Sequence, residues 1–132
     1  MNKRQTVFFE YKKMASLHKK LPSREERKLI SLAKKGDQPA QEKLLLHLVG
    51  FLIFRIETAF SPYIVIRFGE DILQECIIFA TAKIRRYEVR FKNKEGLYKT
   101  YCLCTYLWKG VTGVMFSYVK KNMAEIAMLA DD

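Results

Sequence analysis

The sequence predicts an all-α fold, a compact helical bundle with a basic N-terminal arm. Two positions carry the residue types that begin helices, and residues 70–87 repeat apolar side chains at the spacing of one helix face. A chain of 132 residues is long enough for one domain with one core. We expect the arm over residues 1–21, the helical domain over 22–122 and a C-terminal tail over 123–132.

The first helix with a clear start signal follows the arm, whose own sequence indicates a helix less clearly. Residues 1–20 mix Lys and Arg with aromatic and aliphatic side chains, which favours a helical but loosely attached arm. After Pro22, Ser23 and Glu26 have the spacing of a capping box, in which each side chain accepts a backbone hydrogen bond from the other residue. Gly36 is predicted to end this helix, because glycine adopts the left-handed conformation at little cost.

A second helix is predicted to begin directly afterwards. Asp37 can cap it, and Pro39 is tolerated in a first turn, so the helix should run to about Phe60, where Ser61–Pro62 breaks it. Its apolar run, Leu44–Phe54, is shorter than the roughly 20 residues that cross a bilayer. We therefore expect a central helix buried nearly all round, and no membrane partner.

The third helix has the clearest two-sided pattern. Tyr63–Phe68 has strand propensity, but no second segment offers it a partner, so we expect a packed connector or one helical turn there. Gly69 is predicted to separate this connector from a helix over about residues 70–87. On that helix the expected buried stripe is Ile72, Cys76, Ile77, Ala80 and Ile84, and the expected outward face is Asp71, Gln74, Glu75 and Ile78.

A basic segment leads to the last helix. Residues 85–99 have a turn-like tip at Lys92–Gly96, and the final helix is predicted over about 98–122. Gly110 and Gly113 lie inside it, and each costs about 1 kcal/mol relative to alanine. Such glycines indicate a close approach to the backbone or a bend.

Charge is distributed in blocks along the chain. The net charge is +10, with +8 over residues 1–35, −3 over 36–82, +8 over 83–121 and −3 over the last eleven residues. The basic blocks favour a polyanion such as DNA or RNA, and the acidic block favours a different partner. The alternative is that the Lys and Arg residues only keep a small domain soluble.

The cysteines and the other residue types that serve in catalysis predict neither a metal site nor an active site. Cys76, Cys102 and Cys104 are odd in number and form no spaced pairs, which is typical of a reducing compartment and predicts a cytoplasmic protein. We expect no metal site and no cofactor, since no ligand set or phosphate-binding loop is present. No nucleophile lies near a base in the pattern of an active site, so we expect no enzyme.

Several stretches follow one another in an order typical of a known family. They are Ser23–Glu26 and Lys35–Asp37 with Ala40–Leu44, then Asp71–Glu75, Cys104–Leu107 and Tyr118–Lys121. Together, over roughly residues 22–121, they resemble region 2 of the bacterial sigma factors of the sigma-70 family. The resemblance implies a helical domain in the bacterial cytosol, associated with the nucleoid, that takes part in promoter recognition.

The resemblance also implies two binding surfaces. The acidic helix would dock on the clamp helices of the largest subunit of the RNA polymerase core, and the last helix would recognise the minus-ten element and capture bases of the non-template strand. The implied polymerase contacts are Asp71, Gln74 and Glu75, with Ile78 and Phe79 as neighbours. The candidate DNA-binding residues are Arg90, Lys92, Lys94, Tyr98, Tyr101, Tyr106, Trp108, Lys109, Lys120 and Lys121. Aromatic rings stack on unpaired bases and Lys neutralises phosphate, whereas each aromatic side chain could instead pack in the core.

Two departures from the family pattern leave alternatives open. Lys109 and Gly110 stand where the family often has a pair of tryptophans. Only eleven residues follow Lys121, too few for the domain that reads the minus-thirty-five element, so we expect a second protein subunit to supply a region 4-like domain. The alternatives are a sigma-derived modulator or decoy that binds polymerase without initiating, and a non-specific nucleic-acid-binding domain.

Overall fold

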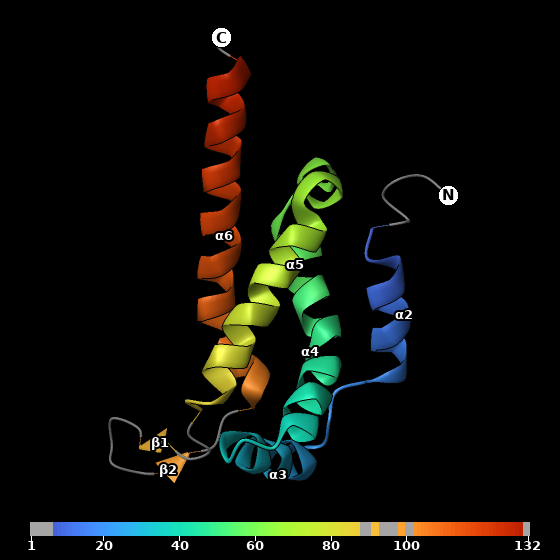
Figure 1. Ribbon diagram of the computed structural model, residues 1–132, viewed down its shortest axis with the longest axis vertical. Coiled ribbons are helices and arrows are strands. Elements are labelled where there is room, and N and C mark those ends of the chain that lie inside the picture. Colours follow the sequence, from blue (N-terminus) through green and yellow to red (C-terminus); the bar gives the residue numbers. More distant parts are fainter. Residues whose placement is uncertain (1–6, 88–90, 93–97, 100–101, 131–132) are drawn as a thin grey trace.

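The computed structural model describes residues 7–87, 91–92, 98–99 and 102–130, and it confirms the all-α class (Figure 1). A pair of two-residue strands, β1 and β2, joins α5 to α6 and pairs in antiparallel register, Phe91 with Lys99 and Lys92 with Tyr98. The elements are α2 (Phe9–Leu17), α3 (Ser23–Lys34), α4 (Gln38–Ala59), α5 (Pro62–Ile84), β1 (Phe91–Lys92), β2 (Tyr98–Lys99) and α6 (Leu103–Ala130).

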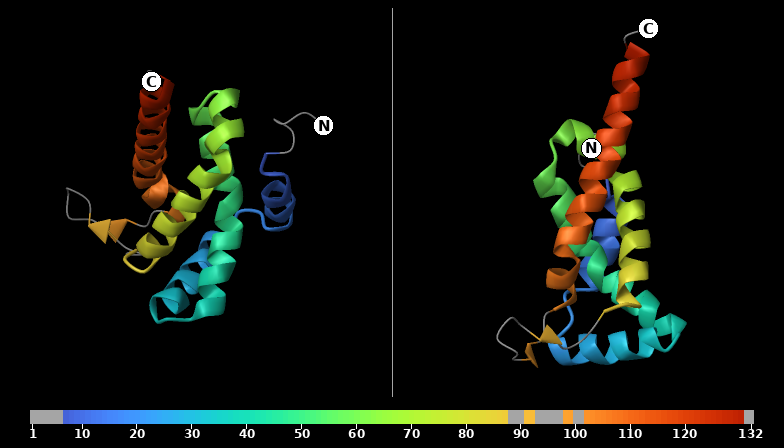
Figure 2. Two further views of the ribbon diagram at one scale, coloured as in Figure 1. Left: turned by 45° about the horizontal axis from the view of Figure 1, so that its top comes forward. Right: turned by 90° about the vertical axis from the view of Figure 1, so that its left-hand side faces the viewer.

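Three long helices make the body of the molecule. α5 packs against both α4 and α6, and α3 lies across the lower end of the bundle (Figure 1). α2 packs on α4, on the opposite side of the α4–α5 pair from α6 (Figure 2). The core fills the space between these helices with fully buried side chains, the largest of which are Tyr87, Phe8, Ile30, Leu44, Leu52, Ile56, Ile72, Leu73, Ile84, Leu103, Leu107 and Met115.

The predicted junction between α3 and α4 is confirmed. Gly36 has a φ of 96°, and its N–H bonds to the Ala33 carbonyl at 3.0 Å, closing the helix end with a left-handed residue. Asp37 then caps α4, because its Oδ1 accepts from the Ala40 N–H at 3.1 Å. Both bonds of this turn join residues three positions apart.

The predicted capping box at Ser23 is wrong. Pro22 is the N-cap of α3, and no side chain caps that end. Glu26 is instead buried, and its Oε1 accepts from the Leu103 N–H at 2.7 Å. Leu103 is the first residue of α6, where backbone N–H groups lack helical partners and the helix dipole favours a negative charge. Glu26 therefore stabilises the start of a helix 77 residues away.

The predicted boundary at Gly69 is also wrong. Tyr63–Phe68 forms the first turns of α5, with Pro62 at the helix start, and the helix ends at Ile84 rather than near residue 87. Gly69 lies inside α5, where a Cβ would stand 2.9 Å from Cζ of Phe8. Its function is to admit the Phe8 ring, and the tertiary contact explains the glycine that the sequence suggested as a break.

The described part of the arm, residues 7–21, is attached more firmly than predicted. Phe8 is completely buried although its φ of 65° is left-handed, and Ala15 packs against Gly50 of α4. An exposed salt bridge joins Lys12 to Glu57 of α4 at 2.9 Å. Because α2 itself has no buried residue within Phe9–Leu17, Phe8 supplies its main apolar contact.

The bounds of the last helix differ from the prediction at both ends. Tyr98 belongs to β2, so α6 begins at Leu103 rather than at residue 98. The helix continues to Ala130, and the predicted boundary at 122 falls within it. In Figure 1 the C-terminal turns of α6 rise beyond the other helices.

Candidate functional site

One exposed strip runs along α5, and we call it the α5 strip: Asp71, Gln74, Glu75 and Ile78. All four side chains are exposed, as the helical spacing predicted, and Ile78 is 64% exposed. Side chains are described for residues 7–87 and 102–124. Within these ranges one salt bridge forms, between Lys12 and Glu57. The strip's carboxylates thus have no cationic partner within that part of the chain.

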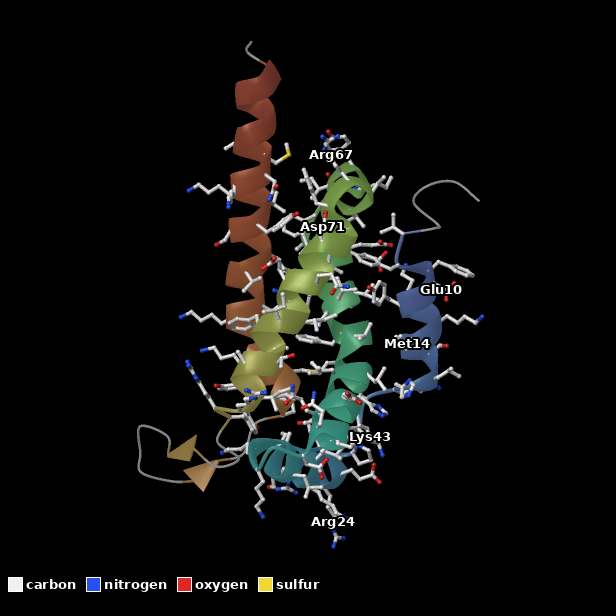
Figure 3. All side chains as sticks on the ribbon, in the orientation of Figure 1. Glu10, Met14, Arg24, Lys43, Arg67 and Asp71 are labelled. Carbon is white, nitrogen blue, oxygen red and sulfur yellow. The ribbon has the colours of Figure 1, made fainter. Side chains whose placement is uncertain are left out.

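The α5 strip lies between α2 and α6. Figure 3 shows Asp71 on α5 with α6 on one side and α2, marked by Glu10, on the other. Gln74 Nε2 donates to the Tyr11 hydroxyl of α2 at 2.6 Å, and Asp71 borders a shallow depression of about 290 Å³ next to Val7. One of the predicted polymerase contacts is therefore already hydrogen-bonded within the chain.

Glu75 faces the other way, into a groove between α5 and α6. The groove has a volume of about 720 Å³. Glycines and a serine of α6 leave room for it, and a lysine and an asparagine of the same helix also line it. Its lining consists of Glu75, Gly110, Gly113, Val114, Ser117, Tyr118, Lys121 and Asn122.

Phe79 is a packing residue rather than a free contact. A Cβ at Gly110 would stand 2.2 Å from Cζ of Phe79, so the ring lies directly on the backbone of α6. The expected close approach is therefore confirmed at Gly110. At Gly113 a Cβ would meet nothing within 4 Å, and that glycine only widens the groove.

The candidate DNA-binding residues fall into distinct environments. Lys109, Lys120 and Lys121 are exposed on α6, and the first two, eleven residues apart, lie on one face of the helix. Tyr106 is half-buried and packs edge-on against Tyr87, with ring centroids 4.8 Å apart. Lys92 and Tyr98 lie in β1 and β2, and Arg90, Lys94 and Tyr101 lie outside the described residues.

Trp108 is held by residues that sequence reasoning missed. It is 46% exposed, and the Arg55 guanidinium carbon of α4 lies 3.8 Å from the indole centroid. Phe51, one turn before Arg55, contacts the same indole at a tilt, with centroids 5.8 Å apart. A single arginine at the end of the apolar run of α4 was the one sequence signal for this cluster.

The cysteines occupy different electrostatic environments. Desolvation raises the pKa of the buried Cys76 thiol to about 12 and that of Cys104 to about 11. Desolvation also acts to raise the pKa of Cys102, but hydrogen bonds from Thr105 and the charge of Lys20 outweigh it and lower that pKa. Within the part of the chain that the structure describes, no three His, Cys, Asp or Glu side chains are grouped to hold a metal ion.

Comparisons with known proteins gave no match. No family model, no curated protein and no solved structure matches this chain. Over the ranges 7–87 and 102–130, none of the helices combines the length and the apolar character needed to cross a membrane.

Proposed function

We propose that this chain is a sigma-like transcription protein that binds the RNA polymerase core through the α5 strip and promoter DNA through α6. The observation that carries the proposal is the strip itself. It places carboxylates, which have no cationic partner among the described side chains, next to a large exposed apolar side chain in a protein of net charge +10.

A protein surface with basic and apolar side chains suits the α5 strip best. Ile78 exposes 64% of its surface, and such an apolar side chain is covered favourably by a partner. Asp71 and Glu75 lie one turn apart on the N-terminal side of Ile78, which sets a charge pattern that a basic helix can match. DNA, a polyanion, would by contrast be repelled by these carboxylates.

DNA is proposed to lie along α6. Lys109 and Lys120 share the exposed face of that helix, and Trp108 offers a half-exposed ring. Phosphates would bind the lysines and an unpaired base would stack on the indole. A separate subunit with a region 4-like domain would add recognition of the minus-thirty-five element.

A polymerase-binding modulator that does not initiate is the second candidate, and Gly110 favours it. The family often has tryptophan at this position, whereas here the Phe79 ring lies on the glycine and leaves no room for a side chain. A run-off assay separates the candidates. Transcript made only when the chain and its partner subunit are both present supports the sigma-like function, and polymerase binding without any transcript supports the modulator.

Charge reversal of the strip tests the proposal. The double variant Asp71→Lys/Glu75→Lys should reduce co-purification with core polymerase by about tenfold or more, because each lysine replaces an attraction with a repulsion. The matched control is Glu42→Lys, which reverses an exposed carboxylate on α4. Undiminished binding by a double variant whose helical circular dichroism equals that of the wild type would contradict the proposal.

A further inference from the structure

Arg55, Trp108 and Thr112 form a closed set of contacts between α4 and α6. The Arg55 guanidinium carbon lies 3.8 Å from the centroid of the indole, and Nη2 donates to the Thr112 hydroxyl. The Thr112 hydroxyl in turn donates to the Trp108 carbonyl at 2.8 Å. One residue of α4 therefore fixes both the ring and the backbone turn that carries it.

The guanidinium is an unusual choice for a residue that only packs. Arg55 Nε is buried. Within residues 7–87 and 102–124 it has no hydrogen-bond partner, and no carboxylate there pairs with Arg55. Burying a polar group without a partner is unfavourable, and an apolar side chain of similar length would fill this space without that penalty. Among these described side chains the positive charge thus has no counter-ion, and it lies next to a half-exposed indole.

We infer that Arg55 is a positioning residue that holds Trp108 as a platform for one unstacked nucleobase, an inference that rests on the proposed DNA-binding function. With the guanidinium stacked on the ring and Phe51 tilted against it, Trp108 still exposes 46% of its surface. A base can stack on the free part of the indole, and the charge of Arg55 attracts the adjoining phosphate. A ring fixed before binding loses little freedom when the base arrives.

The chain contains one tryptophan, so its fluorescence reports on this site alone. The experiment titrates the full chain with a single-stranded oligonucleotide carrying a fluorophore and follows both tryptophan quenching and fluorophore anisotropy. The variants are Arg55→Met, Arg55→Lys and Thr112→Val. Arg67→Met is the matched control, because it removes an exposed arginine whose guanidinium carbon lies over the Phe68 ring, 5.5 Å from its centroid, instead of over Trp108.

The wild type should bind with strong quenching. Arg55→Met should weaken binding about tenfold and reduce the quenching at saturation, whereas Arg67→Met should weaken binding about twofold and leave the quenching unchanged. Arg55→Lys keeps the charge but lacks the planar group, so it should recover part of the affinity and little of the quenching. Thr112→Val removes the hydroxyl that holds the guanidinium and should give an intermediate result.

The outcomes separate this inference from the function on which it rests. If the wild type neither binds nor is quenched, the proposed DNA binding fails. If the wild type binds with quenching and folded Arg55→Met does the same, DNA binding stands and the role of Arg55 is refuted. Should Arg55→Met fail to fold, Thr112→Val decides, and wild-type quenching and affinity in that variant would refute the role.

Discussion

Replacing Phe8 with alanine should destabilise the protein by about 3–5 kcal/mol, the usual cost of removing a large buried ring. Phe8 is 0% exposed and lies against Gly69 of α5, whereas the residues of α2 itself are not buried. The variant should release α2 before the rest of the bundle unfolds. Hydrogen exchange should accelerate in Phe9–Leu17, and thermal unfolding should shift to lower temperature.

The neighbouring ring provides the control for that prediction. Phe9 is 47% exposed, so Phe9→Ala should change the free energy of unfolding by no more than about 0.5 kcal/mol. Equal losses of stability in the two variants would show that Phe8 is not the residue that attaches α2.

Replacing Gly110 with alanine should destabilise the protein by about 1–3 kcal/mol, although alanine is the better helix former. The new Cβ would lie 2.2 Å from Cζ of Phe79, so the ring must leave the α5–α6 contact. The same change at Gly113, where nothing lies within 4 Å, should instead stabilise the protein by about 0.5–1 kcal/mol. Chemical denaturation of both variants measures their free energies of unfolding, which should change in opposite directions from the wild type.

A second variant identifies the cause of the loss at Gly110. In a Phe79→Ala background the clash is absent, so Gly110→Ala should become neutral or stabilising through helix propensity. A loss of stability that persists without the Phe79 ring would mean that the glycine is required for another reason.

The local features of the fold could be predicted from sequence, and the features set by distant contacts could not. Gly36 and Asp37 act within a few residues, and both roles were predicted. Glu26 has the spacing of a capping box, but its carboxylate binds Leu103 of another helix. Gly69 was predicted to separate a connector from a helix, because glycine is a poor helix former. It instead lies inside α5 and accommodates the Phe8 ring of the arm. In both cases a contact between distant parts of the chain overrides the local signal.

The candidate site divides in the same way. Helical periodicity predicted which residues of α5 are exposed, since the spacing alone determines the face. It could not predict that Phe79 and Tyr106 would be occupied in packing against Gly110 and Tyr87. Arg55 was missed because its partner is on α6, 53 positions along the chain.

Photo-crosslinking from the α5 strip would show directly whether the strip contacts RNA polymerase. With a benzoylphenylalanine in place of Ile78, irradiation of the complex with RNA polymerase core should crosslink the chain to the largest subunit. The same residue in place of Phe54, 58% exposed on α4, should give little or no such product. An absent crosslink from position 78, or an equal yield from both positions, would contradict polymerase binding through the α5 strip.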